Sequence, residues 1–497
     1  MRFFYLAAAC LFMYFSRGDQ PYALAVWLFW IFLLRYFRMS QPLIGYLIAV
    51  LVMAVPVYFS SLGMVLLPKA QLLLYSLVVS FISLIPFLLD RMFYRELPRS
   101  ICFLFFPSLM VSLYYLYSFS GNGTWGNPAY ALSGDKFLLQ LASLTGIWGF
   151  IFMSGLFASI FNFFWESGFE FKQAQMPILI FLVLYFLIYS YGALRLRYAS
   201  VPERAVQAAA LTPTLQQRSD LKKTLLLLRS GNTMEGVQIE ILQQIMAGIF
   251  ENLLEKSDQM AGVGADLVAW SEGSVILFES DKEHLLSKAC DLAKSKHIYL
   301  GLAVIVVSES ALKTENKKNP GFRNILILIN SEGRIAIEHQ KARLVAGLEA
   351  PFFNQGNGVF QFHDTSEGRV SAAICYEMIF PNYIRKAGKL ETEILLAPSS
   401  DWKNVRNIHY RMAVLRAVEN GFSILRPTSD GITAAVDPYG RIMGQVDYFV
   451  SSTFNMITIL PVERVNTLYT AIGDWLAWMC LIFSAALISI TLFRKHV

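Results

Sequence analysis

Residues 370–377 read Val-Ser-Ala-Ala-Ile-Cys-Tyr-Glu, a short apolar run that ends in a thiol and a carboxylate. Small and β-branched side chains in a run of this length favour a buried strand. A buried strand that ends at a reactive group holds that group rigidly at the rim of a sheet. We therefore expect Val370–Ile374 to form a strand that delivers Cys375 at its end.

Two stretches upstream of Cys375 end in a similar way. Asp266–Trp270 reads Asp-Leu-Val-Ala-Trp and leads through a serine into Glu272. Lys341 follows a second predicted strand, Arg334–Glu338, and precedes Glu349. A carboxylate, an ammonium and a thiol are thus candidates for one site, although their spacing in the chain fixes no geometry.

The three groups suit nucleophilic catalysis. A thiol with a pKa of about 8.5 is a poor nucleophile at neutral pH until a base removes its proton or a cation stabilises the thiolate. Glu272 could act as that base. Lys341 could stabilise the thiolate of Cys375 and the oxyanion that forms when a thiol attacks a carbonyl carbon.

The chain around these residues has the pattern of a layered α/β domain. From about residue 203 to 462, short β-rich runs alternate with amphipathic stretches, which is typical of sheets covered by helices. About 260 residues can bury a substantial core. The predicted helices span 233–256, 282–295, 378–388 and 406–420.

The N-terminal part of the chain has a different composition. Of 497 residues, 55% are hydrophobic and 16% are charged, against roughly 25% charged in an ordinary soluble domain. Only 16 of the Asp, Glu, Lys and Arg residues lie in 1–194, and the other 62 lie in 195–497. This partition predicts an N-terminal membrane domain over 1–196 and a polar domain that follows it.

A helix needs about 20 residues to cross the apolar core of a bilayer. Apolar runs of roughly that length predict about seven transmembrane helices in 1–196 and an eighth in 470–493. The predicted spans are 3–16, 21–36, 41–60, 71–89, 100–118, 138–164, 176–194 and 471–493.

The Lys and Arg residues between these spans predict the orientation. Cytoplasmic loops of membrane proteins carry an excess of basic residues. If the N-terminus is cytoplasmic, most loop cations fall on that side and the polar domain falls on the other. The residues on the proposed inner side are Arg2, Arg35, Arg38, Arg91, Arg95, Arg99, Lys172, Arg494 and Lys495, and those in the short outer loops are Arg17, Lys69 and Lys136.

Several other functions are disfavoured. The net charge of +6 arises mainly from these loops, which does not favour a nucleic-acid surface. Of five cysteines, only Cys290 and Cys375 lie in the polar part, so no disulfide framework is predicted. No Cys and His residues have zinc-ligand spacing, and the chemistry above requires no metal or other cofactor.

The chain resembles the nitrilase, or carbon–nitrogen hydrolase, superfamily at several motifs. These are Trp270-Ser271-Glu272, Lys341 to Glu349, Ile374-Cys375-Tyr376-Glu377, Arg416–Gly421 and Asp430–Gly440. The similarity extends into the apolar half, where Trp125–Pro128 and Leu139–Gly149 are similar to the membrane-spanning branch of that superfamily, the apolipoprotein N-acyltransferases.

The resemblance implies a fold, a reaction and a set of site residues. The fold is a multi-pass helical membrane domain with an αββα sandwich. The reaction takes an acyl chain from a phospholipid onto Cys375 and then onto the N-terminal amine of a diacylglyceryl apolipoprotein. Glu272 is implied as general base and Lys341 as the residue that stabilises the oxyanion, with Glu349, Tyr376 and Glu377 as supporting residues. The implied location is the bacterial inner membrane, with the catalytic domain on the periplasmic side.

The sequence departs from the family pattern at several positions. Ser271 and Ala346 stand where proline is usual. Ser399–Lys403 lacks the usual Asn-Asp-x-Trp-Phe-Gly, and Ser429 stands where asparagine is common. The family's tryptophan-bearing loop has no counterpart in 213–221. All three triad positions are nevertheless present.

Two alternatives to N-acyl transfer stay open at this level. A membrane-anchored amidase or nitrilase would use water or another amine as the acceptor. A non-enzymatic lipoprotein-binding protein would not need Glu272, Lys341 and Cys375. A catalytic histidine is not expected, because the sequence offers no group to orient His339 or His409.

Overall fold

The computed structural model describes residues 1–200, 202–230, 236–312, 321–451 and 453–496. The chain divides into two compact units. One unit comprises Met1–Ala199 and Thr467–Val497, and the other comprises Ser200–Asn466. The first is helical, and the second contains all the strands of the described residues.

The helical unit is built from apolar helices of different lengths. In chain order its helices are α1 (Arg2–Phe15), α2 (Ala23–Arg38), α3 (Pro42–Ser61), α4 (Lys69–Ser83), α5 (Ile85–Phe93), η1 (Tyr94–Glu96), α6 (Cys102–Tyr117), α7 (Ala129–Leu132), α8 (Lys136–Leu139), α9 (Ala142–Thr145), α10 (Trp148–Glu166), α11 (Phe171–Arg197), α18 (Leu468–Ile472) and α19 (Trp475–His496).

Five stretches of described helix are long and apolar enough to cross a membrane. Two shorter apolar helices, α1 and α6, accompany them. These helices make the unit a multi-pass membrane domain, as expected. The five long stretches are Pro42–Ser61, Lys69–Glu96, Trp148–Glu166, Phe171–Arg197 and Trp475–Arg494.

The predicted span 138–164 is wrong at its N-terminal end, because the helix starts only at Trp148. Before it, the chain forms the short helices α8 and α9 and turns at Gly146, whose φ is 63°. Glycine adopts this conformation without steric cost. A Cβ atom at Gly146 would also lie 2.5 Å from the ring of Tyr469, so the turn and the close packing both require glycine.

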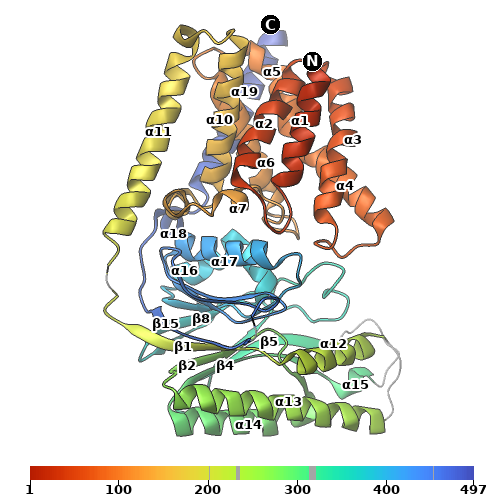
Figure 1. Ribbon diagram of the computed structural model, residues 1–497, viewed down its shortest axis with the longest axis vertical. Helices are drawn as coiled ribbons and strands as arrows, with labels where there is room; N and C mark the ends of the chain where they lie inside the picture. The colour runs from red at the N-terminus through yellow and green to blue at the C-terminus, as the bar shows by residue number, and fades with distance from the viewer. Residues whose placement is uncertain (201, 231–235, 313–320, 452, 497) are drawn as a thin grey trace. The chain divides into compact units, whose positions relative to one another are not determined.

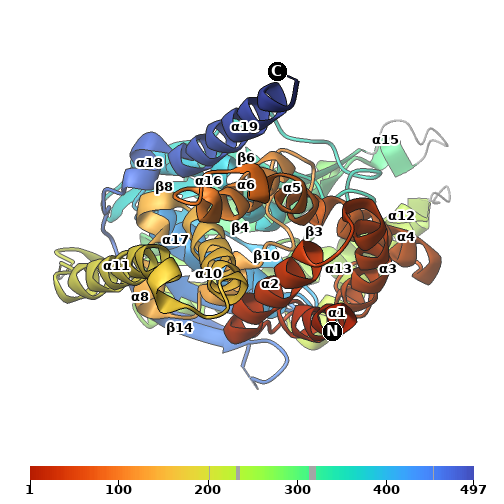
Figure 2. The same ribbon diagram turned by 90° about the horizontal axis from the view of Figure 1, so that it is seen from above.

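Charged side chains buried in the helical unit have partners. Arg38 on α2 donates to both carboxylate oxygens of Asp90 on α5, at 2.9 and 3.1 Å. Trp148 Nε1 donates to Asp474 Oδ1 at 2.6 Å and so connects α10 to the C-terminal segment. Figure 2 shows α2 next to both α1 and α10, with which it packs. Pairing of this kind offsets the cost of placing charge in an apolar environment.

The second unit is a sandwich of two sheets. Its strands are β1 (Ala205–Leu211), β2 (Leu267–Trp270), β3 (Ile276–Phe278), β4 (Tyr299–Val307), β5 (Phe322–Ile329), β6 (Ile335–Gln340), β7 (Phe362–Thr365), β8 (Gly368–Ala372), β9 (Ile394–Leu396), β10 (Ser399–Ser400), β11 (Ser423–Arg426), β12 (Thr428–Ser429), β13 (Ile432–Val436), β14 (Ile442–Asp447) and β15 (Met456–Pro461). Its helices are α12 (Leu215–Arg229), α13 (Gly236–Gly262), α14 (Glu279–Lys296), α15 (Glu309–Leu312), η2 (Cys375–Ile379), α16 (Pro381–Lys389) and α17 (Arg406–Asn420).

The layers follow the order helix, sheet, sheet, helix. One sheet has the order β15-β1-β2-β4-β5-β6, with β3 on β4, and the other has the order β14-β13-β11-β9-β8-β7. Helices α13 and α14 cover the first sheet, and α16 and α17 cover the second (Figure 1). The expected αββα sandwich is confirmed.

Strand β2 shows why these sequences form a sandwich. Leu267 and Ala269 belong to the core between the two sheets, whereas Val268 and Trp270 belong to the core under α13 and α14. Because successive side chains of a strand point to opposite faces, a strand buried on both faces is continuously apolar. Trp270 Nε1 also donates to Ser257 Oγ on α13 at 2.9 Å, which fixes the strand to the helix.

Some predicted elements differ from the structure. The predicted helix 378–388 is interrupted, since η2 ends at Ile379 and α16 begins at Pro381, where proline suits a first helical turn. The predicted helix 233–256 begins outside the described residues, and α13 is described from Gly236. Helix α12 was not predicted.

Candidate active site

Sheet topology brings Glu272 and Lys341 to the same edge. Glu272 follows β2, and Lys341 follows β6. Strand β2 is parallel to β4, while β5 is antiparallel to both β4 and β6. Strands β2, β4 and β6 therefore run in one direction, and their C-terminal ends meet at one edge. Asn324, near the start of the antiparallel β5, lies at this edge as well.

Lys341 lies between two carboxylates. Its Nζ is 2.7 Å from Glu272 Oε1 and 2.8 Å from Glu349 Oε1, and its side chain is 1% exposed. Burial alone would lower the pKa of Lys341, but Glu272 and Glu349 raise this pKa well above its ordinary value. The lysine is therefore a fixed cation at neutral pH.

The two oxygens of Glu272 differ in their contacts. Oε1 accepts hydrogen bonds from Lys341 Nζ and, at 2.8 Å, from Asn324 Nδ2. Among the residues that the structure describes, Oε2 has no hydrogen-bond partner. Oε2 is thus the oxygen that can accept a proton from another group.

Cys375 stands at a strained turn after β8. Its φ is 46°, a left-handed conformation that is uncommon for residues other than glycine. Such conformations concentrate at functional sites. Its backbone N–H donates to Pro398 O at 2.9 Å, and its Sγ lies 4.0 Å from Ser400 O.

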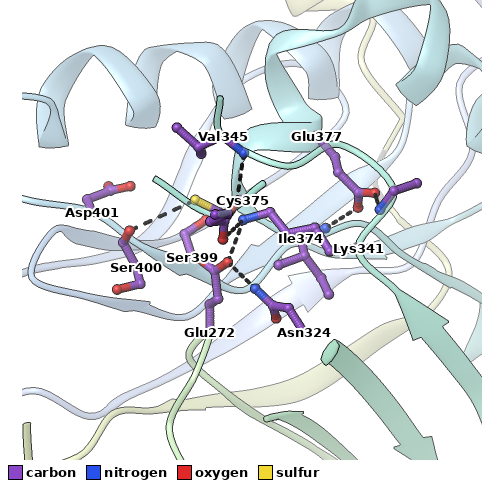
Figure 3. A network of polar contacts seen from close by, with 12 residues as sticks. Glu272, Asn324, Lys341, Val345, Ile374, Cys375, Glu377, Ser399, Ser400 and Asp401 are labelled. Atoms are coloured by element: carbon purple, nitrogen blue, oxygen red, sulfur yellow. Dashed lines mark hydrogen bonds and ion pairs between the residues drawn. The ribbon is translucent and has the colours of Figure 1, made fainter. Parts of the chain in front are cut away.

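The sulfur of Cys375 lies between two groups of polar side chains. Figure 3 shows Ser400 and Asp401 on one side and Glu272 and Lys341 on the other. Burial and the charge of Glu272 raise the pKa of the Cys375 thiol well above its ordinary value, although Lys341 lowers it. The resting thiol is therefore protonated at neutral pH and needs a base to become a nucleophile.

Glu377 connects the turn of Cys375 to the loop of Lys341. Its carboxylate accepts hydrogen bonds from the backbone N–H of Ile374 at 2.6 Å and of Ala342 at 2.7 Å, and it lies 2.8 Å from His339 Nε2. Burial would raise the pKa of Glu377, but His339 and these bonds hold it below its ordinary value. The two N–H groups belong to the neighbours of Cys375 and Lys341, so this anion fixes both segments.

The other two supporting residues also lie at the site. Glu349 binds Lys341 through Oε1 and accepts the backbone N–H of Val345 through Oε2 at 2.9 Å. Tyr376 follows Cys375 in η2, and its ring packs edge-on against Phe380 with centroids 5.6 Å apart.

A second ionic cluster lies beyond Ser400. Asp401 Oδ1 is 2.8 Å from His409 Nδ1, and Asp401 Oδ2 accepts from Arg426 Nη2 at 2.8 Å. The sequence-based statement that no group orients the histidines is wrong, because Asp401 orients His409 and Glu377 orients His339. Asp401 interacts electrostatically with Cys375, whose pKa it raises.

The departures from the family pattern lie around this site. Ser271 is buried and its hydroxyl lies 3.0 Å from that of Ser274, while its backbone N–H donates to Leu211 O. Ser429 Oγ is buried without a hydrogen-bond partner in the described part of the chain. Asp401 is engaged as above, and Glu272, Lys341 and Cys375 lie together at the site alongside these departures.

Sequence reasoning missed Asn324 and the Asp401 cluster. Asn324 is a buried amide near the start of a strand that reads Phe-Arg-Asn-Ile-Leu-Ile-Leu-Ile, in which every other residue except Arg323 is apolar. A buried polar side chain in such a strand is a signal, because it needs a partner. No group of three His, Cys, Asp or Glu side chains suited to a metal ion occurs in the described ranges.

Comparison with known proteins gives a consistent result. Residues 237–458 match the carbon–nitrogen hydrolase family. The chain is 26% identical over 449 residues to an apolipoprotein N-acyltransferase of Geobacter metallireducens, covering 85% of this chain and 80% of that protein. It is 23% identical to an apolipoprotein N-acyltransferase of Rickettsia bellii, covering 75% and 72%. An amidase structure from Nesterenkonia sp. is 14% identical, covers 56% of this chain and 98% of its own, and has a TM-score of 0.40. The family match and the two N-acyltransferase relatives confirm the resemblance drawn from the sequence.

Proposed function

We propose that this chain, a membrane enzyme of the N-acyltransferase and carbon–nitrogen hydrolase type, transfers an acyl chain from a phospholipid to the N-terminal amine of a diacylglyceryl apolipoprotein. The observation that carries the proposal is the contact of Lys341 with Glu272 and Glu349 next to the thiol of Cys375. This arrangement supplies a base, a cation and a nucleophile in one buried place.

The first half-reaction would form a thioester. Glu272 Oε2 takes the proton from Cys375 as Sγ attacks an ester carbonyl carbon of the phospholipid. Lys341 stabilises the negative charge that develops on the carbonyl oxygen. The carbon–oxygen bond to glycerol then breaks, and the proton passes from Glu272 to the leaving oxygen to give a lysophospholipid.

The second half-reaction would consume the thioester. The amine of the acceptor attacks the carbonyl carbon, and Glu272 takes a proton from the amine. The carbon–sulfur bond breaks as the amide bond forms, and the thiol regains its proton. Base catalysis of this type typically contributes about 10²- to 10⁴-fold to a rate.

A membrane-bound enzyme suits these substrates. Transfer of an acyl chain into water costs about 0.8 kcal/mol for each methylene group. An enzyme anchored in the bilayer avoids this cost for both lipids. We propose that the chain lies in the bacterial inner membrane, as the family resemblance implies. The distribution of Lys and Arg in the loops supports a catalytic unit on the periplasmic side.

Peptide mass spectrometry of the full-length protein incubated with phospholipid vesicles tests the proposal. We expect an acyl group on Cys375 that hydroxylamine removes and that a diacylglyceryl lipopeptide converts to an N-acylated product. If water alone discharges the thioester and the lipopeptide stays unmodified, the chain is an amidase or esterase instead. If no acyl-Cys375 forms from any ester, the proposed function is wrong.

A further inference from the structure

Helix α12 brings two cations to the Ser400 side of Cys375. Arg218 Nε donates to Asp430 Oδ2 at 2.8 Å, and Lys222 Nζ lies 2.8 Å from the same oxygen. Arg218 Nη2 also donates to Ser400 Oγ. Residues 218 and 222 are one helical turn apart, so both side chains project from the same face of α12.

This cluster has more positive than negative charge. One carboxylate, Asp430, faces both cations and can compensate for only one of them. Arg218 and Asp430 are largely buried, with side chains 12% and 7% exposed, whereas the Lys222 side chain is 54% exposed. The excess charge is therefore accessible at Lys222, while Arg218 fixes the cluster to Ser400.

The cluster is connected to the nucleophile by direct contacts. Ser400 binds Arg218 through its hydroxyl, and its carbonyl oxygen faces Cys375 Sγ at 4.0 Å. If the ester of a substrate binds at Sγ on the side of Ser400, the part of the substrate that adjoins this ester would lie next to α12. In a phospholipid, the anionic phosphodiester is separated from the reacting ester only by the glycerol backbone.

We propose that Arg218 and Lys222 bind the phosphodiester of the acyl donor. This inference rests on the proposed function, because it assigns a binding site to the first of its two substrates. Guanidinium and ammonium groups form strong charge-assisted hydrogen bonds with phosphate oxygens. The acceptor presents an amine and no phosphate, so the cluster acts in the first half-reaction and not in the second.

A matched pair of variants on α12 tests the proposal. Lys222→Gln removes the accessible charge and leaves Asp430 paired with Arg218. Lys223→Gln makes the same change one residue away, at a side chain that is 73% exposed and pairs with Asp220 on its own helix. Formation of acyl-Cys375 is followed in full-length protein in nonionic detergent, with phosphatidylglycerol or uncharged p-nitrophenyl butyrate as the donor.

Lys222→Gln is expected to raise the KM for phosphatidylglycerol by about 5- to 10-fold relative to that for the uncharged ester. The kcat for phosphatidylglycerol should change little, and Lys222→Arg should restore the KM. Lys223→Gln should leave the ratio of the two KM values as in the wild type. Acyl transfer from preformed acyl-Cys375 to a lipopeptide should proceed at the wild-type rate in Lys222→Gln.

Three results would overturn the assignment. One is an unchanged ratio of KM values in Lys222→Gln, and another is an equal effect of Lys223→Gln. The third is saturation of the cluster by glycerol 3-phosphate at micromolar concentration, which would indicate a site for a soluble anion. Failure of the proposed function itself looks different, because the wild type would then form no acyl-Cys375 from phosphatidylglycerol.

Discussion

Two buried ionic clusters flank Cys375, and they differ in how fully their charges are paired. On one side, Lys341 is a single cation between two carboxylates, Glu272 and Glu349. On the other side, Asp401 is a single carboxylate bound by His409 through one oxygen and by Arg426 through the other. Glu272 and Lys341 follow strands of the first sheet, whereas Asp401 follows β10, and both clusters act electrostatically on the thiol.

From this difference we predict which cluster takes part in the reaction and which one only supports the site. Both oxygens of Asp401 are used, so a proton transfer to Asp401 would first have to break a contact. Glu272 uses Oε1 for Lys341 and Asn324 and leaves Oε2 available, within the described part of the chain. A buried group that is fully paired stabilises the fold, whereas one with a free acceptor can exchange a proton.

Replacement of the reactive carboxylate tests the comparison most strongly. Glu272→Gln keeps the size and the polar contacts of the side chain but removes the proposed base, so formation of acyl-Cys375 should fall by about 10²- to 10⁴-fold. The rate is measured by mass spectrometry under single-turnover conditions. Glu279→Gln, at a side chain 48% exposed and paired with Arg323, is the matched control and should retain wild-type activity. If Glu272→Gln lowers the rate of acyl-Cys375 formation by less than tenfold, the proposed difference in role between the Lys341 cluster and the Asp401 cluster is wrong.

Removal of the cation on the reactive side should affect stability as well as rate. Lys341→Met leaves Glu272 and Glu349 buried without their shared cation. Breaking a buried pair by removing one partner costs about 3 kcal/mol or more. The free energy of unfolding is measured in detergent by denaturant titration. The double variant Lys341→Met/Glu349→Gln buries one charge fewer than Lys341→Met, so it should recover part of the lost free energy of unfolding. A double variant that is less stable than Lys341→Met would contradict this explanation.

The positions of Glu272, Lys341 and Cys375 could be predicted because each comes shortly after a predicted strand. The contacts among the three residues depend on the order and direction of strands in two sheets. Nothing local in the sequence determines that order, so proximity could be inferred only from the family resemblance.

Helix α12 could have been predicted from its own sequence. Thr214 and Gln217 form a capping box, in which Thr214 Oγ1 accepts from the Gln217 backbone N–H at 3.3 Å and Gln217 Oε1 accepts from the Thr214 backbone N–H at 2.9 Å. Thr-x-x-Gln is a known signal for the start of a helix. The partners of Arg218 on α12, Ser400 and Asp430, lie about 200 residues away in the chain, and no sequence signal identifies them.

The cluster of Asp401, His409 and Arg426 should respond to mutation in the opposite way. Its disruption should lower the stability of the protein more than the rate of acylation. Asp401→Asn weakens the contacts of His409 and Arg426, and we expect a loss of about 2 kcal/mol in the free energy of unfolding at neutral pH. Acylation of Cys375 measured below the unfolding temperature should fall by less than about tenfold. A larger loss of rate without loss of stability would show that Asp401 takes part in the chemistry.

The pH dependence of this loss has a definite sign. Burial would raise the pKa of the Asp401 carboxyl, but Arg426 and His409 hold that pKa below its ordinary value. A carboxyl whose pKa is lower in the folded state stabilises the protein above its unfolded pKa of about 3.9, and this contribution is lost as the pH falls through the folded value. The difference in stability between wild type and Asp401→Asn should therefore be constant from pH 5 to 7 and shrink below about pH 4.

The smallest effect is expected for substitution of His409. This substitution tests whether a histidine that is oriented by a carboxylate is also catalytic. Asp401 holds Nδ1 of His409, which is the geometry that a catalytic histidine would need. Glu272 and Lys341 are nevertheless the charged side chains with the largest influence on the pKa of Cys375. We therefore expect His409→Gln, which preserves a hydrogen bond to Asp401, to lower the rate of acyl-Cys375 formation by no more than about threefold, within the range of a weakened neutral hydrogen bond. The pH–rate profile should keep the shape of the wild type. A loss as complete as that of Cys375→Ser would instead make His409 the base and Glu272 the support, and so reverse the roles of the two clusters.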